Sequence, residues 1–252
     1  MKFVPFLFVL GAFSLLNAVT LKVAAAANLS VVIDVLEKEY EKTHPDVKIT
    51  TSVASSGKLT AQIQNGAPYD IFLSADMKYA QKLYKKGFAY TRPLVYAQGY
   101  LVLFTKKNID ISSGIRSLVN QDIRSIAVAN PKTAPYGKIT EDVLRKSGEL
   151  HWVHTKLVYG ESIGQTLLYG LQSADVAIVA KSALFHPKMV QYKQHKHWID
   201  IDRSLYKPLD QGGVVLKNAK NKDVAKSFFL FLFSKEAQKI WESYGYGIPQ
   251  GK

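Results

Sequence analysis

The chain has 252 residues, of which 47% are hydrophobic and 21% are charged, a composition typical of a globular protein with one or two domains. It has no cysteine, which excludes a disulfide scaffold, a thiol nucleophile, a cysteine zinc site and a lipid-modified cysteine anchor. The formal net charge is +13, but the lysines are scattered and no motif that reads DNA or RNA accompanies them. We interpret the charge as a solvated basic surface and expect no nucleic-acid partner.

The N-terminal segment has the pattern of a secretory signal peptide. Lys2 gives a positive start, residues 3–16 form an apolar stretch, and the small residue Ala18 completes a cleavage site. The apolar stretch is short for a membrane-spanning helix. We therefore expect residues 1–18 to be a signal peptide that is cleaved after Ala18, and the mature chain to be located in the periplasm.

The mature chain begins with a strand that runs directly into a helix. Residues 23–27 form a short apolar run that suits a buried strand, and apolar residues recur at helical spacing between Leu29 and Tyr40. Between the two segments lie Asn28 and Ser30, small polar residues of the kind that begin a helix. Because the first N–H groups of a helix have no partner within it, such a junction is a potential anion site.

Strand and helix patterns alternate along much of the remaining chain. Short connections separate them, which is typical of a parallel α/β sheet. The predicted strands cover residues 46–53, 70–75, 125–129, 157–159 and 176–179, and the predicted helices cover residues 59–64, 76–86, 136–146 and 162–172, followed by two C-terminal helices.

Two long strand-like segments, residues 94–106 and 198–216, interrupt this alternation. We interpret them as crossovers between two domains. Domain I then comprises residues 19–97 and 203–252, and domain II comprises residues 98–202. The predicted fold class is α/β, with two Rossmann-like α/β domains joined by crossover strands.

At four strand ends the chain enters a polar or Gly/Pro-rich turn that begins a helix. The four junctions are Ala27-Asn28-Leu29, Ser55-Ser56-Gly57, Asn130 to Gly137, and Gly160 to Gly164. Two fall in each predicted domain, so a cleft between the domains would bring all four together. Ligands of open α/β sheets bind outside the carboxyl ends of the strands. Four helix N-termini at one cleft would supply neutral donors and favourable dipoles for a small dianion.

Several motifs resemble those of a known family. They are Ala24-Ala-Ala-Ala-Asn28-Leu, Ser55-Ser-Gly-Lys-Leu59, Gln62-Ile-Gln-Asn-Gly-Ala-Pro68, Asp70-Ile-Phe-Leu-Ser-Ala-Asp76, Asn130-Pro131, Ala134-Pro-Tyr-Gly137 and Tyr244-Gly-Tyr246. Together, and in this order, they are similar to motifs of the periplasmic molybdate-binding proteins of ABC importers. The resemblance extends over essentially the whole mature chain.

The resemblance implies a type II periplasmic binding protein fold that closes on molybdate or tungstate through neutral hydrogen bonds. The implied ligand residues are Asn28, Ser56, Tyr136 and Ile163, the last through its backbone N–H, with Ala27, Ser55, Gly57 and Ala180 in supporting positions. Some members of the family bind through a tyrosine at the position of Ala180. Tyr136 is therefore the candidate for the missing hydroxyl.

The same resemblance implies the partners. A receptor of this kind delivers its oxyanion to the membrane permease of an ABC transporter, needs no cofactor, and is expected to be a monomer. We also expect no metal-cation site. The pairs His151/His154 and His195/His197 are not accompanied by a carboxylate pattern, so we interpret them as surface histidines.

Two alternatives are open. The first is a receptor for sulfate or phosphate. Sulfate differs from molybdate mainly in size, whereas phosphate carries a proton and needs an acceptor, for which Glu161 is near enough in sequence to be considered. The second is a secreted hydrolase that uses Ser56, but Ala54 occupies the place of the first glycine of a Gly-x-Ser-x-Gly elbow. We do not expect an enzyme.

Overall fold

The structure is a computed structural model, and it describes residues 18–249 of the chain. The predicted signal peptide therefore lies outside the described residues except for Ala18. In the described part of the chain, no helix has both the length and the apolar character needed to cross a membrane.

The first sheet has five strands in the order β2-β1-β3-β10-β4. Its strands are β1 (Val19–Ala26), β2 (Val47–Ala54), β3 (Ile71–Leu73), β4 (Leu94–Gly99) and β10 (Leu209–Val215). β1 pairs in parallel with β2 and β3, whereas β10 is antiparallel to both β3 and β4. The parallel strands therefore point their carboxyl ends to the same edge of the sheet.

The second sheet also has five strands, in the order β7-β6-β8-β5-β9. Its strands are β5 (Leu101–Phe104), β6 (Ile126–Ala129), β7 (Leu157–Gly160), β8 (Val176–Ala180) and β9 (Trp198–Asp200). β6 is parallel to β7 and β8, and β5 is antiparallel to β8 and β9. The two sheets have the same plan: three parallel strands, then one antiparallel strand, then an outer strand that is antiparallel to the fourth.

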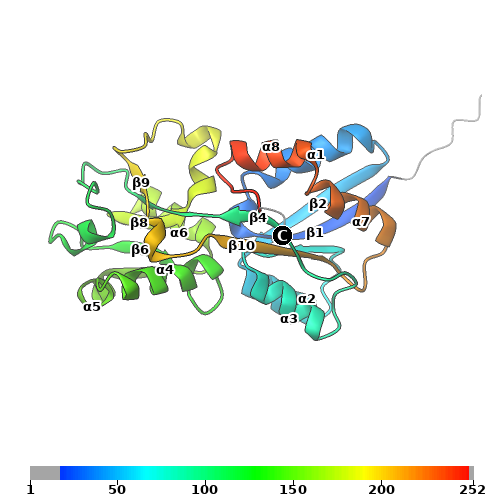
Figure 1. The fold of residues 1–252 in the computed structure, drawn as a ribbon, viewed down its shortest axis with the longest axis horizontal. Helices are drawn as coiled ribbons and strands as arrows, with labels where there is room; N and C mark the ends of the chain where they lie inside the picture. Colours follow the sequence, from blue (N-terminus) through cyan, green and yellow to red (C-terminus); the bar gives the residue numbers. More distant parts are fainter. Residues whose placement is uncertain (1–17, 250–252) are drawn as a thin grey trace, which may run out of the picture.

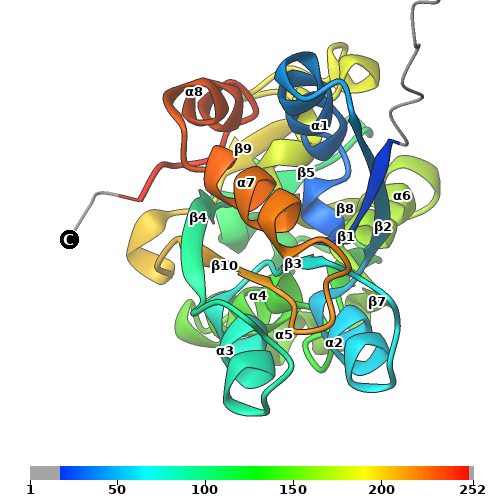
Figure 2. The ribbon, with the colours of Figure 1, turned by 90° about the vertical axis from the view of Figure 1, so that its right-hand side faces the viewer.

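Helices cover both faces of the first sheet. The helices around it are α1 (Ile33–Thr43), α2 (Ser56–Gln64), α3 (Met77–Lys85), α7 (Lys222–Phe231) and α8 (Lys235–Ser243). α1, α7 and α8 pack on one face and α2 and α3 on the other (Figures 1 and 2). The aromatic residues Phe228 and Phe229 of α7 are buried in this core. We call the first sheet with these helices the first lobe.

The second lobe is built around the second sheet and contains α4 (Pro135–Lys146), α5 (Leu150–Val153) and α6 (Ile163–Gln172) (Figure 1). Short 3-10 helices complete the structure: η1 (Ala27–Leu29), η2 (Gly114–Val119), η3 (His154–Lys156), η4 (Lys181–Phe185), η5 (Pro187–Met189) and η6 (Arg203–Leu205).

The chain passes between the lobes twice. β4 ends at Gly99 and β5 of the other sheet begins at Leu101, and the return passage lies between β9 and β10. This architecture confirms the predicted class of two α/β units joined by crossover strands. The division into residues 19–97 with 203–252 and residues 98–202 stays a prediction, and β4 extends two residues beyond its first limit.

The first helix begins later in the structure than the sequence predicts. The segment from Ala27 to Leu29 forms a 3-10 turn, and α1 begins only at Ile33. Asn28 caps neither the 3-10 turn nor α1: its Nδ2 is hydrogen-bonded to residues distant in the sequence, and its Oδ1 has no partner among the described residues. Ser30 is exposed and ends the 3-10 turn, with its backbone N–H donating to the carbonyl of Ala27, but it is not the N-cap of α1.

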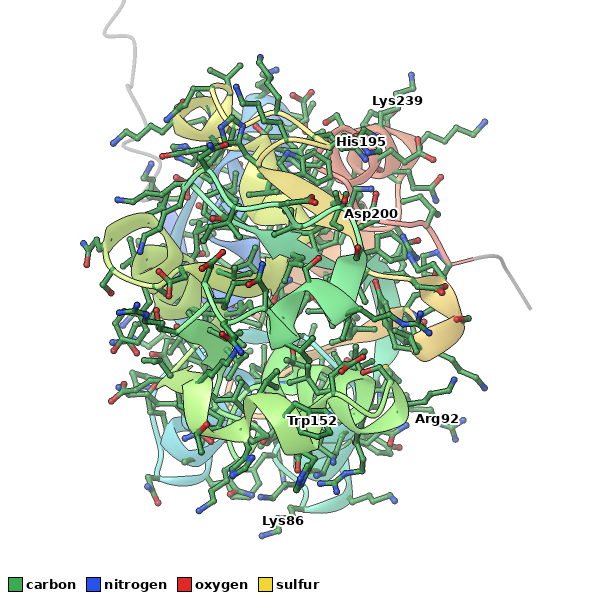
Figure 3. All side chains as sticks on the ribbon, turned by 90° about the vertical axis from the view of Figure 1, so that its left-hand side faces the viewer. Lys86, Arg92, Trp152, His195, Asp200 and Lys239 are labelled. Atoms are coloured by element: carbon green, nitrogen blue, oxygen red, sulfur yellow. The ribbon has the colours of Figure 1, made fainter. Side chains whose placement is uncertain are left out.

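Basic side chains lie on the surface, as expected from the scattered lysines. Lys86, Arg92 and Lys239 extend outward from different parts of the molecule (Figure 3). The exposed Trp152 lies on the second lobe. Lys193 and Lys196, between η5 and β9 of the second lobe, are also exposed, so the basic residues are spread over both lobes.

Candidate anion-binding site

The four predicted junctions meet between the lobes. Gly57 donates its backbone N–H to the carbonyl of Thr133 across the lobes at 2.9 Å. A Cβ on Gly164 would lie 3.8 Å from the Cβ of Ala27, so the first and fourth junctions are also in contact. The structure therefore brings the four junctions to one place and has the lobes closed on each other.

Three helix N-termini offer unpaired backbone donors at this place. Ser56 and Ile163 are the first residues of α2 and α6, and Tyr136 follows Pro135 at the start of α4. Within residues 18–249, no backbone carbonyl accepts the N–H groups of these three residues. All three residues are buried. An anion between the lobes could accept these N–H groups and would lie at the positive ends of three helix dipoles.

The local sequence explains why these N–H groups are available. Pro135 suits the first position of α4 because it has no N–H of its own to satisfy. The hydroxyl of Ser162 caps α6 by accepting from the N–H of Gln165 at 3.2 Å, which leaves the N–H of Ile163 unused. Ser55 precedes α2 and makes no side-chain cap bond.

Ser56 also offers a hydroxyl. Its Oγ accepts the backbone N–H of Ala75, just beyond β3, at 3.0 Å. This bond fixes the side chain and leaves the hydroxyl hydrogen for another acceptor. The backbone carbonyl of Ser56 accepts from the hydroxyl of Thr60 at 2.7 Å. Ser56 is 1% exposed, so only a group enclosed between the lobes could accept its hydrogen.

Tyr136 has a neutral hydroxyl. Its Oη accepts from Nε2 of Gln211 at 3.2 Å, and the ring lies against the crossover at Gly99. A Cβ on Gly99 would lie 2.1 Å from this oxygen, so only glycine fits there. Burial, with the neighbouring tyrosine hydroxyls, raises the pKa of Tyr136 well above its usual value of 10.0. The hydroxyl therefore stays protonated at physiological pH.

Asn28 forms hydrogen bonds with three other residues. Its Nδ2 donates to Oε1 of Gln211 at 3.0 Å and to Oη of Tyr246 at 3.1 Å. Its backbone carbonyl accepts from Tyr246 at 2.8 Å and from Ser182 at 3.2 Å. Its Oδ1 is buried and has no partner among the described residues. In this orientation both N–H bonds of the side-chain amide are used within the protein, and the ligand role expected for Asn28 stays a prediction.

The supporting residues differ in what they can contribute. Ala27, Ser55 and Ala180 are buried at the junctions or beside them. Gly57 uses its N–H on Thr133, so that group is not available to a ligand in this structure. Ala180 ends β8 and has no hydroxyl, so no fifth side-chain donor comes from that strand.

Charged side chains lie at the mouth of the site. Nζ of Lys58 is 3.9 Å from Oε2 of Glu161, and the pair joins the N-terminal ends of α2 and α6 across the lobes. The side chain of Glu161 is 81% exposed, so it is not an acceptor inside the site. Beside this pair is a cavity of about 390 Å³ whose lining includes Ser55 and Ser162. In the part of the chain that is described, no three His, Cys, Asp or Glu side chains are grouped as metal ligands would be.

Sequence reasoning missed Gln211 as a part of the site and did not assign a role to Tyr246. Both are buried and bond to Asn28, from which they are separated by 183 and 218 residues. Tyr246 belongs to the quoted Tyr244-Gly-Tyr246 motif, which was the only signal for it. Gln211 lies in the return crossover, where a polar residue among glycines gives no distinct pattern.

Two α/β lobes that close over buried helix N-termini define the class of two-lobed solute-binding proteins. The chain matches the family described as bacterial extracellular solute-binding protein over residues 21–247, and it belongs to this family.

Named relatives are similar over nearly the whole chain. The molybdate-binding protein ModA of Azotobacter vinelandii is 33% identical over 92% of this chain and 91% of its own length. The putative ABC transporter substrate-binding lipoprotein YvgL of Bacillus subtilis is 31% identical over 90% of this chain and 86% of its own. The solved structure of the Azotobacter vinelandii periplasmic molybdate-binding protein matches with a TM-score of 0.84 and 31% identity, and covers 91% of this chain and 100% of that one. These matches confirm the predicted periplasmic binding protein fold.

Proposed function

We propose that this protein is a periplasmic receptor that captures molybdate and delivers it to an ABC importer. The observation that carries the proposal is the set of three unpaired helix N-terminal N–H groups, of Ser56, Tyr136 and Ile163, enclosed between two closed lobes. A dehydrated dianion needs a donor for each oxygen, and helix N-termini provide donors without a counter-charge. The names of the relatives, which are binding and transport proteins and not enzymes, support this proposal.

The surrounding chemistry favours an anion that carries no proton. Ser56 and Tyr136 are neutral donors, and the carboxylate of Glu161 is directed to solvent. Hydrogen phosphate would need a buried acceptor for its proton. The unpartnered buried acceptor of the site is Oδ1 of Asn28, and a half-turn of that carboxamide would replace this acceptor with the donor Nδ2. Molybdate and tungstate have the same charge and shape, so we propose that both are bound.

The remaining parts of the proposal concern location and partners. We propose that residues 1–18 direct export and are removed after Ala18, that the receptor acts as a monomer, and that its membrane partner is the permease of an ABC transporter. The ligand is bound unchanged, and no cofactor takes part.

The test is calorimetric titration of residues 19–252 with molybdate, tungstate, sulfate and phosphate in turn. We expect one-to-one binding of molybdate and tungstate and no heat from phosphate. Binding of sulfate in preference to molybdate would agree with a receptor role but would contradict the proposal that molybdate is the ligand. Absence of binding by all four anions would overturn the proposed function.

A further inference from the structure

Gln211 is the centre of a buried hydrogen-bond network that touches two of the predicted ligand residues. Its side chain is fully buried on β10, at a shift in the pairing with β4 between Gln211 and Gly212. Oε1 accepts from Nδ2 of Asn28 at 3.0 Å and from the hydroxyl of Tyr96 at 3.0 Å. Nε2 donates to the hydroxyl of Tyr136 at 3.2 Å.

This network joins the lobes next to the crossover. Asn28 and Tyr96 belong to the first lobe, and Tyr136 belongs to α4 of the second. A Cβ on Gly99 would lie 2.4 Å from Nε2 of Gln211, so the close approach of the carboxamide depends on that glycine. The carboxamide is uncharged, donates at one end and accepts at the other. The orientation of the Gln211 carboxamide therefore decides which neighbouring groups donate to it and which accept from it.

The unsatisfied atom of the network is Oδ1 of Asn28. Both of the bonds that Asn28 makes through its side chain use Nδ2, so Oδ1 is the side-chain atom left to meet a ligand. An oxyanion without protons has only acceptors, and it would be repelled by Oδ1. A half-turn of the carboxamide would place Nδ2 at that position and provide a donor.

Asn28 cannot turn by itself. Its Oδ1 would then face Oε1 of Gln211 across the 3.0 Å that now separates Nδ2 from that oxygen, with no hydrogen between them. A half-turn of Gln211 removes the conflict, because Nε2 then donates to Asn28. The hydroxyl of Tyr96 has one hydrogen and two acceptors within reach, Oε1 of Gln211 at 3.0 Å and the carbonyl of Ser74 at 2.8 Å; after the turn it donates to Ser74 and accepts the other hydrogen of Nε2. The hydroxyl of Tyr246 then donates to Oδ1 of Asn28, and the carbonyl of Asn28 keeps its bond from Ser182. The hydroxyl of Tyr136 then donates to Oε1 of Gln211.

We propose that Gln211 is a positioning residue that turns together with Asn28, so that Nδ2 of Asn28 donates to the bound oxyanion. The inference rests on the proposed function and adds to it a residue that does not contact the ligand. In both arrangements one side-chain atom of Asn28 is left without a partner in the network. This atom is the acceptor Oδ1 in the observed arrangement and the donor Nδ2 in the turned one. An anion without protons selects the turned arrangement. Tyr136 then contributes its backbone N–H to the anion, and its hydroxyl supports Gln211.

The test compares two substitutions of Gln211. Glu has the same shape, but its ionised carboxylate only accepts, so Gln211→Glu holds Asn28 in the observed orientation and adds a negative charge. Gln211→Met removes the hydrogen bonds of the carboxamide and leaves Asn28 free to turn. We expect Gln211→Glu to weaken molybdate binding by at least about 100-fold and Gln211→Met by about tenfold at about pH 8. Gln81→Glu, which adds the same charge on the exposed surface of α3, is the control and should bind as wild type does.

A pH titration separates positioning from packing. When the carboxyl introduced by Gln211→Glu is protonated, it can again donate at one end, and burial raises the pKa of such a carboxyl. The titratable groups around it are the hydroxyls of Tyr96, Tyr136 and Tyr246, whose raised pKa values keep them neutral, and Asp76 beyond Tyr96. Between about pH 8 and about pH 6 the affinity of Gln211→Glu should rise at least about tenfold, while that of wild type should not change.

If Gln211→Glu does not fold, as judged by circular dichroism, the double variant Asn28→Ala/Gln211→Met provides the test. We expect its loss of affinity to equal that of Asn28→Ala, because Gln211 acts through Asn28. Additive losses, or a Gln211→Glu variant that binds as wild type does or responds to pH no more than Gln211→Met, would overturn this inference and leave the proposed function intact. A wild type that binds no oxyanion would overturn the proposed function itself.

Discussion

The backbone N–H of Gly57 donates to the carbonyl of Thr133 at 2.9 Å, and this bond closes one lobe on the other. Gly57 lies in the first turn of α2, and Thr133 precedes α4. A Cβ on Gly57 would lie 2.8 Å from that carbonyl oxygen and 3.0 Å from Cα of Thr133. Because these neighbours are backbone atoms, they cannot move aside as a side chain would. A glycine at this position therefore permits the closed arrangement.

The first prediction concerns this closure. Gly57→Val should hold the lobes apart and weaken molybdate binding by at least about tenfold, because the four junctions no longer meet. Small-angle scattering with saturating molybdate should show a larger radius of gyration than for wild type. Gly164→Ala is the matched control, since its Cβ would meet Ala27 at an ordinary 3.8 Å. A Gly57→Val variant that binds and compacts as wild type does would contradict the role of this contact.

The second prediction concerns Ser56. Ser56→Ala removes the hydroxyl that is available to the ligand, and we expect molybdate binding to weaken by about 1–3 kcal/mol in a calorimetric titration. It also removes the acceptor of the Ala75 N–H, so the unfolding free energy should fall by about 1 kcal/mol in urea. Ser243→Ala, on the exposed side of α8, is the control. Unchanged affinity of Ser56→Ala would show that the hydroxyl does not contact the anion.

The residues of the site differ in how well the sequence predicts their positions. Ser56, Tyr136 and Ile163 each follow a strand and a short polar or proline-containing turn, and the structure places all three at helix N-termini because this pattern is local. The partners of Asn28 lie far along the chain, so no spacing indicates them. Asn28 and Ser30 were also expected to begin the first helix, but α1 begins at Ile33, and the Nδ2 of Asn28 bonds to those distant partners.

The fold was more predictable than the network because its signals are periodic. The alternation of apolar strands and amphipathic helices gave the α/β class and both crossovers. It could not give the antiparallel placement of β10 between β3 and β4, which brings Gln211 beside Asn28. Strand order depends on packing between distant segments, which a single sequence does not display.

The third prediction concerns pH. Burial raises the pKa of Tyr136 well above 10.0 and also raises that of Tyr246, so both hydroxyls stay neutral while exposed tyrosines begin to ionise. Molybdate binding should therefore be constant between about pH 7 and about pH 9.5. At higher pH the unfolded chain loses these protons and the folded one keeps them, so the unfolding free energy should fall. A decline in affinity centred near pH 8 would contradict a site built from neutral hydroxyls.

The fourth prediction concerns the pair at the mouth. Lys58 and Glu161 are both exposed and 3.9 Å apart, a separation at which water and salt screen most of their attraction. Lys58→Ala and Glu161→Gln should each change molybdate affinity by less than about threefold. Neither should create phosphate binding in the same titration. A loss of anion selectivity in Glu161→Gln would instead place this carboxylate in the site.

The last prediction separates stability from binding. Burial acts to raise the pKa of Asp175, but hydrogen bonds from Lys107, Arg124 and Ser125 outweigh it and lower that pKa to about 2. A lowered pKa stabilises the fold above the unfolded value of about 4, and this contribution is lost as the pH falls through about 2. Asp175→Asn should therefore lower the unfolding free energy by about 1 kcal/mol at pH 7, since solvent screens part of the effect.

The same substitution should leave molybdate affinity unchanged, because Asp175 follows α6 at the end opposite to Ile163. Urea unfolding between about pH 2 and about pH 7 measures the difference from wild type, which should shrink below about pH 4. Asp122→Asn, an exposed aspartate, is the control and should show no such trend. A destabilisation of Asp175→Asn that is equal at every pH would mean that lost packing, and not the ionised carboxylate, is responsible.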